Sequence, residues 1–270
     1  MSKNYFKILR AGINSTFQDE GRNNLYHIGI PFSGAMDNRN FLLVNKLVGN
    51  KLKNPVIEFA YQGPLLKYSG EKINIAITGD VNFTIKRNKN LLNGICYQAY
   101  TLEHGDELDI ISTNKSVYGY LAVSGEFDIK YQWSSCSVNT KANIGANDGK
   151  KLETNQRVNI LKINRDLGIK KLDYLNTKIE NIVNTNIKSE GLIKGVVQVP
   201  ADGNPIIMLS DHGTIGGYPK IGVVISADYD KLVQLTPGSK IKFEEIELSN
   251  AETLFKLYDL ETQNLISQIR

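Results

Sequence analysis

The chain has 270 residues, of which 41% are hydrophobic and 22% charged, and its net charge is +4. This is the composition of an ordinary globular protein that is long enough to bury a sizeable core. No apolar run reaches the roughly 18 residues that a membrane-spanning helix needs, and the first residues lack the apolar region of a secretory signal. We therefore expect a cytoplasmic protein with no membrane contact. Lysines are scattered among acids without a basic stripe, which argues against nucleic-acid binding.

The two cysteines, Cys96 and Cys136, lie far apart and form no C-x-x-C pair. Together with the three histidines they show none of the spacings of zinc ligands. We expect reduced thiols and no metal site.

Residues 1–165 form the first β block of what we interpret as a single domain over residues 1–270. Short β-branched and aromatic runs alternate with glycine, proline and aspartate turns, which is typical of a barrel or sandwich. The predicted strands cover residues 5–9, 56–61, 73–78, 82–85, 107–111, 118–123 and 158–163.

One helix is predicted within this block, over residues 36–48, because apolar residues recur there at helical spacing. Asp37 or Ser33 can cap its start, and Gly49 suits the position just past its end. Ser33 and Gly34 lie at the helix entrance, where free backbone N–H groups favour anions.

The rest of the chain divides into three parts. Residues 166–190 form a predicted helical bridge, with the helix itself over residues 167–186. Residues 191–248 form a second β block, with strands over residues 196–199, 205–209, 221–225 and 240–243. Residues 249–270 form a C-terminal helix that begins with the capping box 249–252 and has an apolar face of Leu254, Leu257, Tyr258, Leu265 and Ile269.

The most informative stretch is residues 210–222, which places an acid, an imidazole, a hydroxyl, a phenol and an amine around several glycines. Two apolar runs flank it, and we expect both to be buried strands. Reactive groups are often held on such a loop. A glycine-rich turn with no chemistry is an equally good interpretation of this stretch taken alone.

Two further blocks carry candidate binding residues. Asp19 and Arg22 flank Gly21, and Arg22 can either bind a carboxylate or phosphate or pair with Asp19; the spacing alone favours the ion pair. Residues 135–145 are rich in hydroxyls around Lys141, where a phosphate or carboxylate can sit. Cys136 has no adjacent base, so we do not expect a thiol nucleophile.

In family order, these blocks resemble the KipA family, which supplies the C subunit of bacterial 5-oxoprolinase. The same homology covers the biotin-dependent carboxyltransferase domain of the allophanate hydrolase subunit 2 type. The matching segments are 16–22 (TFQDEGR), 29–31, 33–37 (SGAMD), 47–50, Glu58, 121–125 (LAVSG), 198–203 (QVPADG) and 211–222.

The resemblance implies a mainly β fold with a few helices and a cyclophilin-like β-barrel architecture. It implies two partner proteins, the KipI-like (B) and LamB/YcsF-like (A) subunits of the enzyme. It also implies ATP-driven opening of a small cyclic amide, 5-oxo-L-proline, to L-glutamate. ATP is then the co-substrate of the complex, because phosphorylation of the amide oxygen makes the ring carbon electrophilic enough for water.

On this basis we assign roles to residues of the loop and the two blocks. The expected catalytic group comprises Asp211 as acid/base or orienting carboxylate, Lys220 as an anion holder, and Tyr218 and His212 as proton donors. The expected substrate- or nucleotide-binding group comprises Arg22, Asp19, Ser33, Lys141, Thr214, Gly216 and Gly217.

Members of the family carry other residues at several of these positions. Many have arginine, glutamine and threonine where this chain has His212, Gly213 and Ile215, and arginine in place of Lys141. They also have a longer middle region. These differences motivate a second hypothesis, a non-catalytic regulatory protein that antagonises a KipI-type inhibitor of a sensor kinase. A third hypothesis is biotin-dependent carboxyl transfer of the urea carboxylase type. Biotin is not expected here, because the chain has no biotinyl-lysine context.

Overall fold

The structure is a computed structural model that describes residues 4–163, 168–172 and 190–269. Most of the regular structure in these residues is β-sheet, and three α-helices accompany it, so the mainly β fold with a few helices is confirmed. No helix in the described part of the chain is long and apolar enough to cross a membrane.

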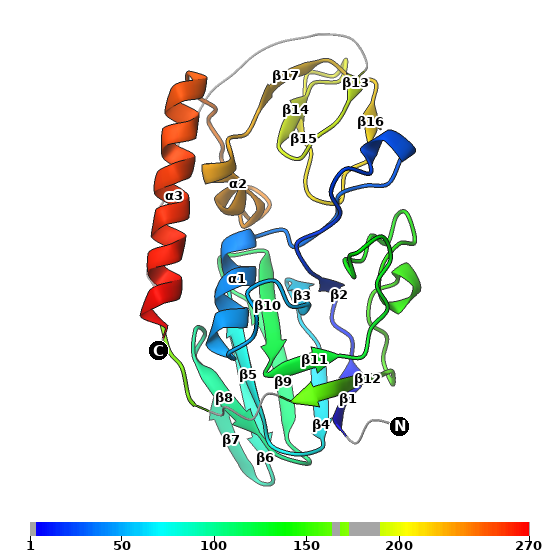
Figure 1. Ribbon diagram of the computed structural model, residues 1–270, viewed down its shortest axis with the longest axis vertical. Coiled ribbons are helices and arrows are strands. Elements are labelled where there is room, and N and C mark those ends of the chain that lie inside the picture. Colours follow the sequence, from blue (N-terminus) through cyan, green and yellow to red (C-terminus); the bar gives the residue numbers. More distant parts are fainter. Residues whose placement is uncertain (1–3, 164–167, 173–189, 270) are drawn as a thin grey trace.

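Twelve strands build the larger part of the molecule, seen at the bottom of Figure 1. In chain order they are β1 (Asn4–Arg10), β2 (Asn14–Gln18), β3 (Val56–Ala60), β4 (Leu65–Ser69), β5 (Ile73–Thr78), β6 (Val81–Arg87), β7 (Asn90–Asn93), β8 (Ala99–Leu102), β9 (Glu107–Thr113), β10 (Tyr118–Val123), β11 (Gly125–Phe127) and β12 (Arg157–Ile163). They form a seven-stranded sheet, β11-β12-β1-β4-β9-β6-β7, and a five-stranded sheet, β2-β3-β10-β5-β8. All the pairings are antiparallel.

The main core lies between these two sheets. Phe6 and Leu66 of the larger sheet pack in one cluster with Ile57 and Ile75 of the smaller sheet, and all four side chains are fully buried. Burial of apolar area on this scale is the main favourable contribution to folding. The two sheets therefore pack face to face, as the alternating strand and turn pattern predicted. The finer likeness to cyclophilin stays a prediction.

A second lobe, at the top of Figure 1, consists of short strands. They are β13 (Glu190–Gly191), β14 (Val196–Gln198), β15 (Ile206–Ile207), β16 (Ile215–Gly216) and β17 (Lys220–Val223). β13 pairs with β16, and β14 lies between β15 and β17. The flanking runs were expected to be buried, which is wrong: Ile206 is 42% and Val223 52% exposed, because this small sheet is covered only in part.

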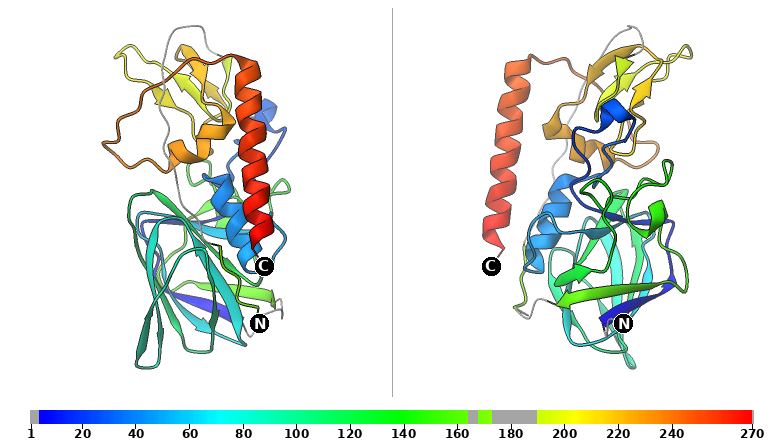
Figure 2. Two further views of the ribbon diagram at one scale, coloured as in Figure 1. Left: turned by 90° about the vertical axis from the view of Figure 1, so that its left-hand side faces the viewer. Right: turned by 45° about the vertical axis from the view of Figure 1, so that its right-hand side comes forward.

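Three helices pack beside the two lobes. α1 (Asn38–Leu47) packs on the five-stranded sheet, α2 (Ser226–Val233) lies between the lobes, and α3 (Leu248–Gln268) runs along one side of the molecule (Figures 1 and 2). The Asp37 carboxylate accepts the Asn40 N–H at 2.9 Å, which confirms it as the N-cap of α1. Gly49 follows the helix with φ of 73°, as the glycine stop predicted.

Two predictions about α3 are wrong. The helix begins at Leu248 with Glu247 as its N-cap and no side-chain cap, so the capping box at residues 249–252 does not form. Leu254 and Leu257, expected on the packed face, are 44% and 57% exposed. The C-terminal half of α3 is the part that packs, and there Ile266 and Ile269 join the α1 core cluster.

Two other elements differ from expectation. Residues 240–243 form no strand, and α2 was not predicted. The helix predicted over residues 167–186 falls mostly outside the described residues. Its described part, residues 168–172, is not helical, and Lys171 instead forms a β-bridge with Gln98.

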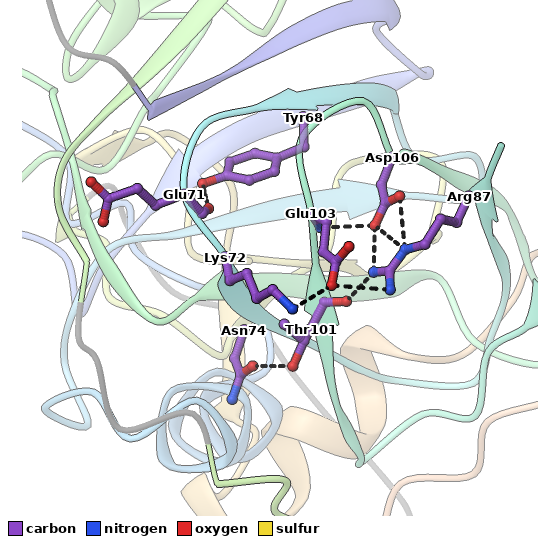
Figure 3. A network of polar contacts seen from close by, with 8 residues as sticks. All are labelled: Tyr68, Glu71, Lys72, Asn74, Arg87, Thr101, Glu103 and Asp106. Carbon is purple, nitrogen blue, oxygen red and sulfur yellow. Dashed lines mark hydrogen bonds and ion pairs between the residues drawn. The ribbon is translucent and has the colours of Figure 1, made fainter.

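The end of the sandwich far from the second lobe is held by a polar network (Figure 3). Asp106 is 2% exposed and accepts Nε and Nη2 of Arg87 at 3.0 and 2.7 Å. Arg87 also lies beside Glu103, which pairs with Lys72 at 2.6 Å. A two-point contact of arginine with a buried carboxylate is among the stronger polar interactions in proteins. The network therefore fixes the β6, β8 and β9 ends at a distance from the candidate site.

Candidate functional site

The loop at residues 210–222 is divided between two environments. Its first part, residues 210–213, lies at the junction of the two lobes. Its second part enters β16 and β17 of the small sheets. The polar residues that the sequence places side by side therefore do not form one cluster.

Ser210 anchors the first part of the loop. It is fully buried, and its Oγ donates to the Ala35 carbonyl oxygen at 3.4 Å. It also shares a hydrogen bond of 3.3 Å with the hydroxyl of Tyr229 on α2. The segment before α1 and the helix α2 thus fix the position of the next residue, Asp211.

Asp211 lies at the solvent edge of the junction. Its Oδ2 pairs with Lys141 Nζ at 2.8 Å, and its backbone carbonyl accepts Asn139 Nδ2 at 3.3 Å. The Asp211 side chain is 37% exposed, so a small molecule can reach the carboxylate. The structure therefore brings together Asp211 and Lys141, two of the predicted site residues, from segments far apart in sequence.

His212 is held by its neighbours. Its ring stacks on Tyr26, with centroids 5.8 Å apart and planes 17° apart, and Nδ1 lies 2.6 Å from the Gly213 carbonyl oxygen. A carbonyl can only accept, so Nδ1 carries the proton and Nε2 accepts from the Tyr26 hydroxyl at 3.4 Å. Burial lowers the pKa of His212, which favours the neutral ring. This geometry gives His212 a packing role and leaves it no free N–H for a substrate.

The remaining predicted loop residues belong to the small sheets. The Thr214 carbonyl accepts the Leu192 N–H, Gly216 pairs with Glu190, and Lys220 pairs with Gln198. Gly217 and Tyr218 are exposed, and the Tyr218 carbonyl accepts Gln198 Nε2 at 3.1 Å. Their predicted roles toward a ligand stay predictions.

Asp19 and Arg22 belong to a separate buried cluster, where each bonds other partners in place of the ion pair that their spacing predicted. Asp19 accepts the Ser135 and Ser137 hydroxyls at 2.5 and 2.6 Å, and the Cys136 N–H at 2.8 Å. The hydroxyl-rich block expected to hold an external anion thus surrounds a carboxylate of the protein itself.

Arg22 is 2% exposed and donates to the Gln132 and Ser135 carbonyls at 3.1 and 3.4 Å. Its Nη1 and the hydroxyl of Ser33 are buried without a partner. Ser33 has φ of 58°, an uncommon conformation for a residue with a side chain. Burial and the Asp19 charge also keep Cys136 protonated by raising the pKa of its thiol, in agreement with the absence of a thiol nucleophile.

Three buried carboxylates near the junction were not predicted as site residues. Glu58 on β3, Asp37 before α1 and Asp230 on α2 are 4%, 4% and 7% exposed. Burial raises the pKa of Glu58 to about 7, and burial together with the nearby Asp230 charge raises the pKa of Asp37 to about 7. A charged residue inside the apolar run of β3 was the signal that marked Glu58 in the sequence.

Lys194 is the cation that faces this acidic group. Its Nζ lies 4.1 Å from the Tyr229 ring centroid, and the Asp230 and Asp37 charges act on it. Burial is nevertheless the largest influence and lowers the pKa of Lys194. The junction therefore carries more buried acids than cations. In the described part of the chain no group of three or more histidine, cysteine or acidic side chains is arranged to hold a metal.

A cavity of about 330 Å³ lies beside the start of α1. Its lining residues are Glu20, Asn23, Phe32, Asn38, Phe41, Leu42 and Lys53. Glu20 and Lys53 pair with each other, so the two charges of the lining are matched. None of the predicted site residues lines this cavity.

Comparison with known proteins gives a consistent result. The family described as "Carboxyltransferase domain, subdomain A and B" matches residues 28–174 and 167–245. The C subunit of the 5-oxoprolinase of Haemophilus influenzae is 30% identical over 92% of this chain and 93% of its own length. The C subunit of the Escherichia coli 5-oxoprolinase is 28% identical over 91% of this chain and 92% of its own length.

Among solved structures, the Kluyveromyces lactis urea carboxylase superposes on the whole chain with a TM-score of 0.83 and 21% identity. This chain spans 30% of that enzyme, so the likeness shows a shared fold. The match to the family covers most of the chain, and the two 5-oxoprolinase relatives match it over more than nine-tenths of its length. The chain therefore belongs to the carboxyltransferase domain family, subdomains A and B.

Proposed function

We propose that this chain is the C subunit of an ATP-dependent 5-oxoprolinase-like hydrolase that opens 5-oxo-L-proline to L-glutamate. It works in the cytoplasm with the KipI-like (B) and LamB/YcsF-like (A) subunits of that enzyme. The observation that carries the proposal is the similarity to two 5-oxoprolinase C subunits over more than nine-tenths of each chain. A name of this kind belongs to one component of a multi-subunit enzyme.

The geometry of the junction supports a role in proton transfer. Asp211 is accessible and beside Lys141, while Glu58 and Asp37 are buried acids whose pKa values lie near 7. Acid–base groups are most effective when their pKa is close to the working pH. In the proposed reaction, water adds to the amide carbon of the ring, the C–N bond breaks, and the nitrogen gains a proton. Asp211 is the group that takes the proton from water or delivers it to nitrogen.

The residues at the junction do not fit a triphosphate. Lys141 is paired with Asp211, Arg22 is buried on backbone carbonyls, and the nearby buried side chains are mostly acids. The ATP requirement therefore stays a proposal for the complex as a whole, with no ATP-binding residue assigned at this junction. Biotin remains unexpected, and the Lys220, Tyr218 and Thr214 roles remain proposals.

The test is reconstitution of the complete complex with its partner subunits and assay of ATP-dependent glutamate release from 5-oxoproline. We expect activity in the wild type and a loss of about 100-fold or more in Asp211→Asn, as for removal of an acid–base group. Asp202→Asn is the matched control, because Asp202 is an exposed turn residue. An inactive wild-type complex rejects the function, whereas an active Asp211→Asn complex rejects only the role of Asp211.

The two other hypotheses give different outcomes in the same experiment. A regulatory antagonist of a KipI-type inhibitor binds its KipI-like partner but shows no turnover. A carboxyltransferase of the urea carboxylase type shows no glutamate release but binds a biotin analogue. The likeness to urea carboxylase is one of fold, so the hydrolase is the preferred proposal.

A further inference from the structure

Glu58 is a charged residue at the centre of β3, where the other residues of the strand are buried and apolar. It lies between Thr16 of β2 and Tyr120 of β10 in the five-stranded sheet. A carboxylate in such a place is costly unless hydrogen bonds stabilise it. Its Oε2 accepts the Met36 N–H at 2.7 Å, and its side chain also bonds the Tyr120 hydroxyl.

The same tyrosine extends the contact by one residue. The Tyr120 hydroxyl accepts the Asp37 N–H at 2.7 Å and donates its own proton to Glu58. Glu58 and Tyr120 therefore hold two successive backbone N–H groups just ahead of α1. N–H groups at a helix start have no partner inside the helix, so this pair fixes the path of the chain there.

The chain segment held in this way carries the loop of the candidate site. Ala35 donates its N–H to the Asp19 carbonyl at 2.9 Å, and its carbonyl accepts the Ser210 hydroxyl at 3.4 Å. Ser210 immediately precedes Asp211. A continuous series of contacts thus leads from Glu58 in the sheet, through residues 35–37, to the residue beside Asp211.

Glu58 is also sensitive to the charges of the site. The negative charges of Asp37 and Asp211 both oppose its ionisation, and with burial they raise its pKa to about 7. The titratable groups that face Glu58 from the elements packed around it are Tyr118, Tyr120, Asp37, Asp211 and Tyr229. The tyrosines stay neutral near pH 7, because burial raises the pKa of each.

We propose that Glu58 is a positioning residue for the site: its ionised carboxylate holds the Met36 N–H and the Tyr120 hydroxyl, and through the Ala35–Ser210 contact it fixes Asp211. The inference rests on the proposed function of the Asp211 loop. Glu58 itself is buried and does not touch the substrate.

The test compares Glu58→Gln with the wild type in the reconstituted complex. Glutamine keeps the shape but directs an NH₂ group at one of the two donors that Glu58 accepts. We expect kcat to fall about 10- to 100-fold with KM within about twofold, because a misplaced acid–base group lowers turnover more than binding. The wild-type kcat should rise with pH through about 7, and this rise should be absent in Glu58→Gln. Wild-type kcat and pH dependence in the variant would overturn the proposal.

Two more variants keep the test decisive if Glu58→Gln folds poorly. Tyr120→Phe removes the hydroxyl that links Glu58 to Asp37, and Ser210→Ala removes the link from Ala35 to the loop. Both should lower kcat in the same direction as Glu58→Gln, and a Tyr120→Phe complex with unchanged kcat counts against the proposal.

A readout without turnover separates this inference from the proposed function. In the isolated full chain, hydrogen exchange of the Met36 and Asp37 amides and of residues 210–213 should become at least about tenfold faster in Glu58→Gln. Faster exchange in the variant, together with an inactive wild-type complex, would keep the positioning role and reject the hydrolase. Unchanged exchange at both segments would reject the positioning role even if the complex is active.

Discussion

The Lys141 ammonium lies 2.8 Å from the Asp211 carboxylate and joins two segments that are far apart in sequence. The lysine side chain is 73% exposed, so the pair contributes less than about 1 kcal/mol to the free energy of unfolding. Its importance is the placement of Asp211. Lys141→Met should therefore leave the melting temperature nearly unchanged but lower kcat/KM of the reconstituted complex by about three- to tenfold.

The matched control for this prediction is Lys130→Met. Lys130 also pairs with an acid, Asp148, at 3.5 Å on an exposed surface away from the loop. Lys141→Arg keeps the charge and should retain most of the activity. If Lys141→Met and Lys130→Met complexes hydrolyse 5-oxoproline equally well, the ion pair does not contribute to the site.

The pH dependence of stability follows from the buried acids Asp37 and Glu58. Both have folded pKa values raised from about 4 to about 7, so the folded state holds their protons at pH values where the unfolded state releases them. Their contribution to stability is complete below about pH 4 and is lost as the pH rises through 7. The free energy of unfolding should fall across this window, by roughly 1 kcal/mol per pH unit for each group.

Urea unfolding at a series of pH values measures this slope. Asp37→Asn should reduce it, because asparagine keeps an oxygen for the Asn40 N–H but does not titrate. Asp148→Asn is the control, since Asp148 is exposed and should leave the slope unchanged. A wild-type stability that rises between pH 4 and 7 would contradict the assignment of raised pKa values.

The central strands were the part of the fold that the sequence predicted best. β5 and β10 have the predicted bounds, because both are buried apolar runs between clear turn residues. α2 was missed because two acids interrupt its apolar pattern; Asp230 is buried only because Tyr258 of α3 and the Arg39 N–H bond it. Such partners come from distant elements and leave no local signal.

The candidate site shows the same limit. Asp211 was identified from its motif, and its pairing with Lys141 matches the expectation that the two blocks contribute to one site. Glu58 was noted only as part of the family pattern, because its importance depends on the Met36 N–H and on Tyr120 of a neighbouring strand. Arg22 was expected to offer its guanidinium to a ligand or to Asp19, but the carbonyls of residues 132 and 135 accept it instead.

Asp19 tests the interpretation of the hydroxyl-rich block as an internal structure. Its carboxylate accepts two serine hydroxyls and the N–H groups of Cys136 and Gly21. Asp19→Asn replaces one acceptor oxygen by a donor and leaves buried donors without partners, so we expect a loss of about 3 kcal/mol in the free energy of unfolding. Chemical denaturation measures it, with Asp202→Asn as the exposed control. A loss below about 0.5 kcal/mol would instead support Asp19 as a ligand-binding group without a structural role.

Gly216 and Gly213 offer a matched pair within the loop. A Cβ on Gly216 would lie 2.5 Å from Gln198 Nε2 and 2.7 Å from Leu192 Cδ1, whereas a Cβ on Gly213 would have its nearest neighbour at 3.8 Å. Gly216→Ala must therefore move Gln198, which bonds the Tyr218 carbonyl, and we expect a cost of about 1–3 kcal/mol. Gly213→Ala should change stability by less than about 0.5 kcal/mol.

Thermal unfolding of these two glycine variants measures the difference in stability. Hydrolysis of 5-oxoproline by their reconstituted complexes shows whether the close packing at Gly216 also matters for the site. Because Gln198 holds the Tyr218 carbonyl, a displaced Gln198 should loosen the second part of the loop and leave residues 210–213 in place. Equal stability of the two variants would mean that Gln198 gives way freely and that the loop is not held by this contact.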